Sequence, residues 1–262
     1  MIPNIAHFVF FYSKRDFLFV QFIAIASARI VNNCDVVIHY YSMPEGKFTD
    51  ILKNDSRIIW KHVPILSYKV GEKTLGSIEH VIDFYKINVL YEMGGICLDL
   101  DTVCVKPWCH LLDNKFVSGI EYVDGITYGL CCAVFMTEVH GEFMKKWKER
   151  YEEIYHPLYW GACSVYLPGL IAKEYMMSEN YTEVNPMCTL LNTDFFLIPH
   201  WKECEKIWID EYDIPDTLIT LHLWHTNPIT KKHMDEIVKD FTWIYENQHT
   251  LYSKIVQQLH IQ

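Results

Sequence analysis

Apolar residues follow two patterns along this chain, short continuous runs and longer stretches with an apolar residue every three or four positions. The short runs, rich in aromatic and β-branched residues, predict strands at 2–11, 35–41, 57–65, 96–100, 115–122, 133–137, 195–199 and 218–224. The longer stretches predict helices at 17–32, 76–93, 142–155 and 160–177, the last broken at Pro168-Gly169, and a final helix from about 230 to the end. Strands that alternate with helices predict an α/β fold with a mainly parallel central sheet flanked by helices. No linker or repeat divides the sequence, so we expect residues 1–262 to form a single domain.

The strongest helix signal lies just before a short strand. The apolar residues of 76–93 fall on one helical stripe: Ile78, Val81, Ile82, Tyr85, Val89 and Met93. The pair Gly94-Gly95 is typical of a helix end. The strand predicted at 96–100 follows at once, and Asp99 interrupts its apolar run.

Composition narrows the classes of function. Half of the 262 residues are hydrophobic, 21% are charged and the net charge is −10. These values are typical of a globular protein and not of a disordered one. An acidic chain with no basic block is a poor candidate for nucleic-acid binding. An anionic ligand would need a local metal ion to reverse the electrostatic field.

The cysteines and the apolar runs indicate the cellular compartment of the protein. The nine cysteines show no C-x-x-C pair and are expected to be reduced thiols, most of them in the core. The apolar run at 17–30 is shorter than the roughly 20 residues of a membrane span, and Gln21 interrupts it. We therefore expect no transmembrane segment and a cytoplasmic location. The oligomeric state is not readable from the sequence.

Two acids, Asp99 and Asp101, end the strand that follows Gly94-Gly95. Unpaired carboxylates are costly to bury, so two of them in an apolar strand point to a ligand. Carboxylate oxygens select hard cations such as Mg²⁺ or Mn²⁺. In an open α/β sheet, ligands bind beyond the carboxyl ends of the strands. An ordinary acidic turn is the alternative interpretation of Asp-x-Asp alone.

The whole run resembles the DXD glycosyltransferases of family 32, which include α-1,4-galactosyltransferases and yeast-type mannosyltransferases, and the sugar-transferring domains of large clostridial toxins. The residues that carry the resemblance are Asp83, Lys86, Leu90, Tyr91, Gly94, Gly95, Ile96, Leu98, Asp99 and Asp101. It implies a GT-A type, Rossmann-like fold, a nucleotide-sugar donor bound through Mn²⁺ (Mg²⁺ as the alternative), and transfer of a hexose with retained anomeric configuration. A UDP-sugar is the favoured donor and GDP-mannose the next, with a glycan or other hydroxyl group as acceptor.

The resemblance also assigns roles to individual residues. Asp101 is expected to bind the metal directly and Asp99 to bind it through water or to contact the donor. Asp83 and Lys86, one helical turn apart, are expected to face the donor sugar, with a surface ion pair as the alternative. The element Leu221-His222-Leu223-Trp224-His225 resembles the family's His-x-Trp closure. It makes His222 the expected third metal ligand and places Trp224 at the donor.

The first strand, His7-Phe8-Val9-Phe10, also resembles that of the family. The resemblance implies that Phe10 stacks on the nucleotide base, and a core phenylalanine is the alternative. Three positions depart from the family pattern. Lys86 lies where the family usually has arginine, and Cys97 where it usually has tyrosine. Tyr128, just before Gly129, lies where asparagine is common. Lysine lacks the fork of two donors that arginine offers, so the choice of donor sugar is open.

Two other functions fit parts of the sequence. Asp99 and Asp101 could begin a haloacid-dehalogenase-like phosphatase, but the motif lies late in the chain and no second acidic pair follows. A catalytically silent nucleotide-sugar-binding protein is the other alternative. Tyr159, Trp160 and Trp201 are possible sugar platforms or core residues. The missing membrane anchor suggests a bacterial or viral source.

Overall fold

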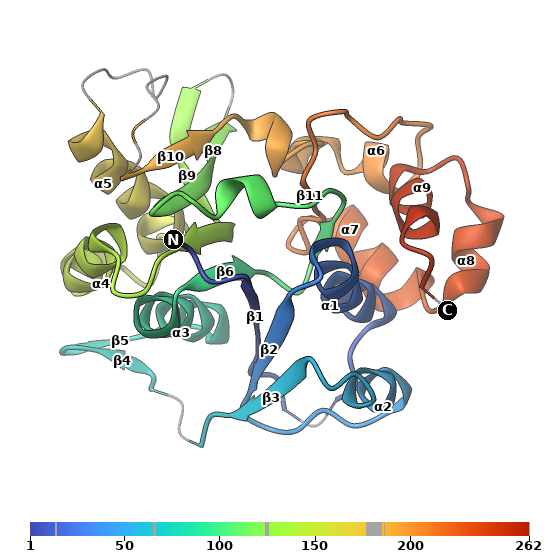
Figure 1. Cartoon of the computed structure of the whole chain (residues 1–262), viewed down its shortest axis with the longest axis horizontal. Helices are drawn as coiled ribbons and strands as arrows, with labels where there is room; N and C mark the ends of the chain where they lie inside the picture. Colours follow the sequence, from blue (N-terminus) through green and yellow to red (C-terminus); the bar gives the residue numbers. More distant parts are fainter. Residues whose placement is uncertain (14, 65–66, 124–125, 177–184, 186, 262) are drawn as a thin grey trace.

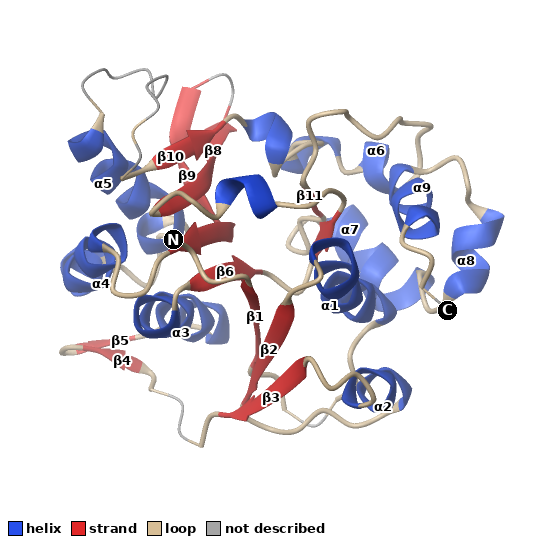
Figure 2. Cartoon of the chain, in the orientation of Figure 1, coloured by secondary structure: helices blue, strands red, loops and turns tan. Residues whose placement is uncertain are grey.

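The protein is described by a computed structural model over residues 1–13, 15–64, 67–123, 126–176, 185 and 187–261. A central sheet runs through the middle of the molecule with helices on both sides (Figures 1 and 2). Seven described strands form it in the spatial order β10–β8–β9–β6–β1–β2–β3: β1 Ile5–Phe10, β2 Asp35–Tyr40, β3 Ile58–His62, β6 Gly95–Leu98, β8 Phe116–Val123, β9 Ile126–Thr137 and β10 Thr189–Leu191.

Most neighbours in this sheet are parallel, as the sequence predicts. Strand β1 pairs in parallel with β2 and β6, β2 with β3, and β10 with β8. Strand β9 alone among the described strands of this sheet runs against its neighbours, β6 and β8. The remaining described strands form two small antiparallel sheets: β4 Lys69–Val70 with β5 Lys73–Thr74, and β7 Thr102–Cys104 with β11 Thr220–His222.

Each face of the sheet packs on its own core. The described α-helices are α1 Phe19–Asn32, α2 Lys47–Lys53, α3 Ile78–Met93, α4 Glu142–Ile154, α5 Leu167–Tyr175, α6 Glu205–Trp208, α7 Pro228–Lys232, α8 Phe241–Glu246 and α9 Leu251–Gln258. Helices α1, α2 and the C-terminal helices share one cluster of buried side chains. Helices α3, α4 and α5 share a second cluster on the opposite face (Figure 1). The predicted α/β fold with a mainly parallel, covered sheet is confirmed.

The turn from α3 into β6 explains the adjacent glycines. Gly94 ends α3 with a φ of 62°, and Gly95 opens β6 with a φ of 104°. A Cβ atom on Gly95 would lie 2.6 Å from the carbonyl oxygen of Ile5, on the neighbouring strand β1. Only glycine tolerates both the positive φ and this close approach of two backbones. The pair therefore fixes where β6 begins and where the acids at its far end lie.

Three predicted elements are wrong. Residues 195–199 form no strand, because the segment turns through a short 3₁₀ helix, η3 Thr193–Phe195, and continues irregularly. The predicted last helix from 230 is several short helices, with Asp240 and Thr250 capping the starts of α8 and α9. Pro168-Gly169 does not break its helix: Pro168 lies at the start of α5, where its missing N–H costs nothing, directly after the π-helix η2 Ala162–Tyr166.

The remaining short helices are η1 Cys109–Leu111, η4 Trp201–Glu203 and the π-helix η5 His233–Ile237. All nine cysteines lie in the described residues as free thiols, seven of them buried, as predicted. Of the helices in the described residues, none combines the length and the apolar character that crossing a membrane requires.

Candidate metal and donor site

The two acids of the Asp-x-Asp motif lie on one tight turn at the carboxyl end of β6. Strand β6 ends at Leu98, and the amide of Thr102 donates to the carbonyl of Asp99 over 3.0 Å, which closes the turn into β7. The amide of Asp99 donates to the carbonyl of Ala133 on β9 over 2.9 Å. Backbone bonds on both sides therefore fix the position of the turn that carries the two carboxylates.

Asp99 is paired with the residues of α3. Lys86 is 3% exposed, and its Nζ contacts the carboxylates of both Asp83, at 3.0 Å, and Asp99. Burial disfavours the ammonium, but Asp99 and Asp83 outweigh it and raise the pKa of Lys86 well above its usual value. Lys86 is therefore a buried cation between two acids, and the alternative of a surface ion pair is wrong.

Asp101 is paired with the C-terminal part of the chain instead. Its Oδ2 lies 3.4 Å from Nε2 of His222 and accepts a 2.8 Å hydrogen bond from the amide of His225. Its backbone carbonyl accepts from the amide of Leu223 over 2.8 Å. Burial opposes ionisation of Asp101, but His222 and the His225 amide outweigh it and hold the pKa of the carboxyl below its usual range.

Together these residues form a possible ligand set for a metal ion. One ligand atom each from Asp99, Asp101 and His222 lie within 4.8 Å of one another. The set joins β6, the turn after it and β11, and β11 is held in place by its antiparallel pairing with β7. Two carboxylate oxygens and an imidazole nitrogen suit Mn²⁺ better than Mg²⁺.

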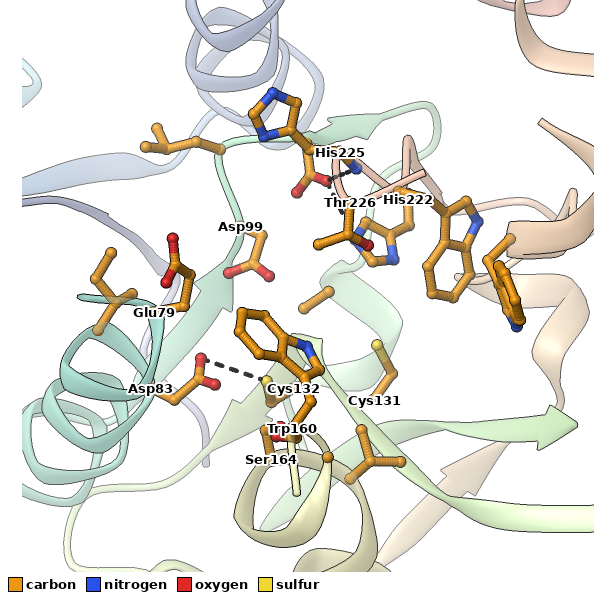
Figure 3. A pocket seen from close by; sticks show the side chains of 18 of the residues that line it. Glu79, Asp83, Asp99, Cys131, Cys132, Trp160, Ser164, His222, His225 and Thr226 are labelled. Carbon is orange, nitrogen blue, oxygen red and sulfur yellow. Dashed lines mark hydrogen bonds and ion pairs between the residues drawn. The ribbon is translucent and has the colours of Figure 1, made fainter. Parts of the chain in front are cut away.

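The ligand set opens into a cavity of about 500 Å³. In Figure 3, Glu79 and Asp83 of α3 point into it from one side, His222 lies on the other, and Asp99 lies between them. Trp224 also lines it, 7% exposed; its indole N–H donates to the carbonyl of Pro199 over 2.8 Å, and its ring centre lies 4.1 Å from that of His222. Asp83, Lys86, Asp99, Asp101, His222 and Trp224 are thus brought to one cavity.

Phe10 is the exception among the predicted site residues. It is fully buried, with its ring centre 4.6 Å from that of Phe17, and it does not line the cavity. Successive side chains of a strand point to opposite faces, and Phe10 points into the core shared with α1. The alternative interpretation, a core phenylalanine, is the one that the structure favours. Tyr12, just beyond the end of β1, lines the cavity instead.

Several lining residues escaped the sequence analysis. Glu79 lies one turn before Asp83 on α3, a spacing that could have indicated it. Glu121 comes from β8, and no sequence signal separates it from an ordinary strand residue. Burial raises the pKa of Glu121, against the opposing effect of His222. Cys132 contributes its Sγ, 3.6 Å from Oδ1 of Asp83. His225, which the sequence analysis does name, also lines the cavity, and its ring contacts Asp235, with Nε2 2.9 Å from Oδ1.

Comparison with known proteins finds sequence relatives of this chain. Residues 32–118 match the family described as glycosyltransferase sugar-binding region containing DXD motif. "Glucan organizing enzyme 1" of Cryptococcus neoformans var. grubii is 24% identical over 215 residues, 77% of this chain and 55% of that protein. The chain therefore spans about half the length of this curated relative. The predicted resemblance to DXD glycosyltransferases is confirmed for the matched region.

Two solved structures are similar to this chain, and one of them supports the fold. Glycosyltransferase GlyE of Streptococcus pneumoniae TIGR4 aligns with 98% of this chain and 62% of its own, with a TM-score of 0.52 and 14% identity. The glycosyltransferase PaToxG aligns with 66% of this chain and 69% of its own, with a TM-score of 0.48 and 14% identity. The predicted GT-A type fold is confirmed by the likeness to GlyE.

Proposed function

We propose that this chain is a metal-dependent, retaining glycosyltransferase that moves a hexose from a nucleotide-sugar to a hydroxyl acceptor. A UDP-sugar is the proposed donor, with GDP-mannose next. The observation that carries the proposal is the convergence of Asp99, Asp101 and His222 on one point of a cavity at the carboxyl end of β6. In open α/β sheets this edge is where ligands bind.

The residues present fit a divalent cation. Asp101 and His222 offer an oxygen and a nitrogen held by backbone contacts, and Asp99 offers a second carboxylate on the same turn. A bound Mn²⁺ would supply Lewis-acid stabilisation of the charge that develops on a departing diphosphate. The net charge of −10 makes such a local positive charge necessary for an anionic donor.

The protein's own side chains would orient the donor. Lys86 holds Asp83 and Asp99 in fixed positions, and carboxylate oxygens accept hydrogen bonds from sugar hydroxyls. We assign the hexose to this side of the cavity. Tyr12, at the carboxyl end of β1, replaces Phe10 as the proposed stacking partner of the base.

Retention of the anomeric configuration needs no protein nucleophile in a front-face reaction. The bond between the anomeric carbon and the phosphate oxygen breaks through an oxocarbenium-like transition state. The acceptor oxygen bonds to the same face of the sugar, and its proton passes to the departing phosphate. The cavity, walled by Trp224 and the residues of α3, would limit the access of water to this step.

The test is nucleoside diphosphate release from a panel of UDP- and GDP-sugars with Mn²⁺, with and without EDTA. Asp101→Ala should reduce the rate by about 100-fold or more, as loss of one electrostatic contact to the transition state does elsewhere. Asp210→Ala, an exposed acid after α6 that does not line the cavity, is the matched control and should leave the rate unchanged. Metal-dependent binding of UDP or GDP without release from any donor would favour the silent binding protein. No binding at all would contradict the proposal.

Two wider proposals accompany this one. Residues 1–262 would act as a single catalytic domain, and the name of the Cryptococcus relative makes glucans natural members of an acceptor panel. We do not propose the phosphatase alternative, because the Asp-x-Asp motif lies in residues 32–118, which match a glycosyltransferase family. The predicted location and source stay predictions.

A further inference from the structure

The two exposed tryptophans of this protein both line the mouth of the cavity. All eight tryptophans lie in the described residues, and only Trp160 and Trp201 are strongly exposed, at 54% and 40%. Tyr159, 67% exposed, lines the same cavity beside Trp160. Clustered exposed aromatic rings mark a binding surface, because burying them elsewhere would stabilise the fold.

These rings are held in place by bonds to the surrounding elements. Trp160 packs on His80 of α3 with ring centres 5.4 Å apart, and Nδ1 of His80 lies 3.0 Å from the hydroxyl of Tyr155. The carbonyl of Trp160 accepts from the hydroxyl of Ser164 over 3.4 Å. Figure 3 shows Trp160 between Cys132 and Asp99, facing the acids of the site. The indole is therefore presented to the cavity by α3 and by η2.

Trp201 is connected to the opposite side of the site. Its carbonyl accepts a 2.7 Å hydrogen bond from the side-chain amide of Asn227, two residues after His225. Trp160 thus belongs to the side of the cavity formed by α3, and Trp201 to the side that carries His222. A ligand that touches both rings would lie between these two sides of the cavity.

The charges that line the cavity restrict what such a ligand can be. Among the described lining residues, five are carboxylic acids and one is a lysine: Glu79, Asp83, Asp99, Asp101, Glu121 and Lys86. The lysine is already paired with Asp83 and Asp99. The proposed metal offsets the charge of Asp99 and Asp101 only, so an acceptor with a phosphate or carboxylate would be repelled by the acids outside the metal ligand set. Glu79 and Glu121 can accept hydrogen bonds from hydroxyl groups.

From these observations we propose that Tyr159, Trp160 and Trp201 form an acceptor site for an uncharged oligosaccharide, an inference that rests on the proposed function. A pyranose ring has an apolar face of C–H groups that stacks on aromatic rings and an edge of hydroxyls for the carboxylates. A neutral glycan chain satisfies both features of the cavity mouth. Anionic lipids and acidic peptides satisfy only the aromatic one.

The test measures binding of neutral pentasaccharides to the full chain with Mn²⁺ and UDP, by saturation-transfer NMR and calorimetry. The probes are β-1,3-, β-1,4- and α-1,4-linked glucose, α-1,6-linked mannose and β-1,4-linked galactose. Vesicles of phosphatidylglycerol form the anionic lipid arm. The wild type should bind at least one pentasaccharide and no vesicle.

Variants then assign the binding to the two tryptophans. Trp160→Ala and Trp201→Ala should each weaken it at least tenfold, and Trp160→Phe, which keeps an aromatic ring, should weaken it less than threefold. Tyr245→Ala on α8, equally aromatic, 63% exposed and away from the cavity, should leave it unchanged. Thermal unfolding of each variant reports whether the fold is kept.

Three results would overturn the acceptor site: no pentasaccharide bound, binding unaffected by both alanine variants, or binding of vesicles in place of saccharides. Metal-dependent UDP binding in the same samples separates this from the proposed function. If UDP binds and no glycan does, the acceptor site alone is wrong. If a glycan binds through Trp160 and Trp201 and no nucleotide does, the proposed function is wrong and the saccharide site stands.

Discussion

Two regions that meet in the cavity are built in opposite ways. The first, α3 with β6, is a regular helix of 16 residues followed by a strand of four. The second, from 193 to 258, has no described helix longer than eight residues and one strand of three. The first owes its shape to local signals, Ser77 at the start of α3 and Gly94 at its end. The second is held by contacts with the rest of the chain, so half of the site is locally encoded and half depends on tertiary structure.

The largest expected effect lies in the first region. Lys86→Met keeps the shape of the side chain and leaves Asp83 and Asp99 without their buried cation. Removing one partner of a buried ion pair costs about 3–5 kcal/mol of unfolding free energy. Urea unfolding in the absence of metal measures it.

The matched control is Lys206→Met. Lys206 pairs with Glu203 at the same three-residue spacing but on the surface, where such pairs contribute about 0–1 kcal/mol. Equal losses of unfolding free energy in the two variants would contradict the buried role of Lys86. They would also weaken the contrast between the two regions.

The second region is tested by replacing His222 and His225 separately. His222→Ala removes a proposed metal ligand and should weaken Mn²⁺ binding with UDP by about 100-fold, or about 2.7 kcal/mol. His225→Ala should change it less than about threefold, because His225 contacts Asp101 through its backbone amide. Electron paramagnetic resonance of free Mn²⁺ measures both, and the reverse order would make His225 the ligand.

Acid pH should destabilise the first region and the strands next to it, because two histidines are buried there. His7 and His39 lie 3.0 Å apart, Nδ1 to Nε2, and burial lowers the pKa of His7 to about 4 and of His39 to about 3. Both pKa values are lower than in the unfolded chain, so the unfolded state binds protons first as the pH falls. Stability is therefore full above about pH 6.5 and is lost below it, by up to about 1.4 kcal/mol per histidine and pH unit.

Chemical unfolding between pH 7.5 and 5 measures this slope. The double variant His7→Asn, His39→Asn should flatten it relative to the wild type, although its stability at pH 7.5 is lower. His110→Asn, at an exposed position, should leave the slope unchanged. An unaltered slope in the double variant would assign the acid sensitivity to other groups.

The smallest effect concerns a helix start in the second region. The side chain of Asn227 accepts from the amide of Ile229 over 2.9 Å and so begins α7. Asn227→Ala removes this cap and the hydrogen bond to the carbonyl of Trp201, and should cost about 1–2 kcal/mol in thermal or urea unfolding. Gln257→Ala, exposed on α9, should be neutral. No change in Asn227→Ala would mean that packing alone determines where α7 begins.

The same contrast explains what the sequence could predict. The helix at 76–93 and the strand at 96–100 match α3 and β6 within two residues, because periodicity and end signals agree there. The strand predicted at 195–199 is absent, since a short apolar run does not distinguish a strand from a buried irregular segment. The caps Asp240 and Thr250 were present in the sequence and would have divided the last helix correctly.

Site residues follow a similar rule. Asp99, Asp101 and His222 were predicted because they belong to motifs, and they do converge. Phe10, which the resemblance places at the nucleotide base, lies in the core, as the alternative had it. A strand covered on both faces shows no polar alternation that reveals which residues point where. Glu121 and the exposure of Trp160 depend on how β8 and η2 pack, which no local pattern encodes.

The hydrogen bonds from Leu223 and His225 to Asp101 join parts of the chain that the ribosome synthesises at different times. The amide of His225 and the carboxylate that it contacts are separated by 124 positions. At translation rates of about 5–20 residues per second, the ribosome needs about 6–25 s to make that interval. A nascent chain that already carries both acids and Lys86 lacks His222, the proposed third ligand, for nearly all of this time, so it could not hold a metal through the full set until the C-terminal region has emerged.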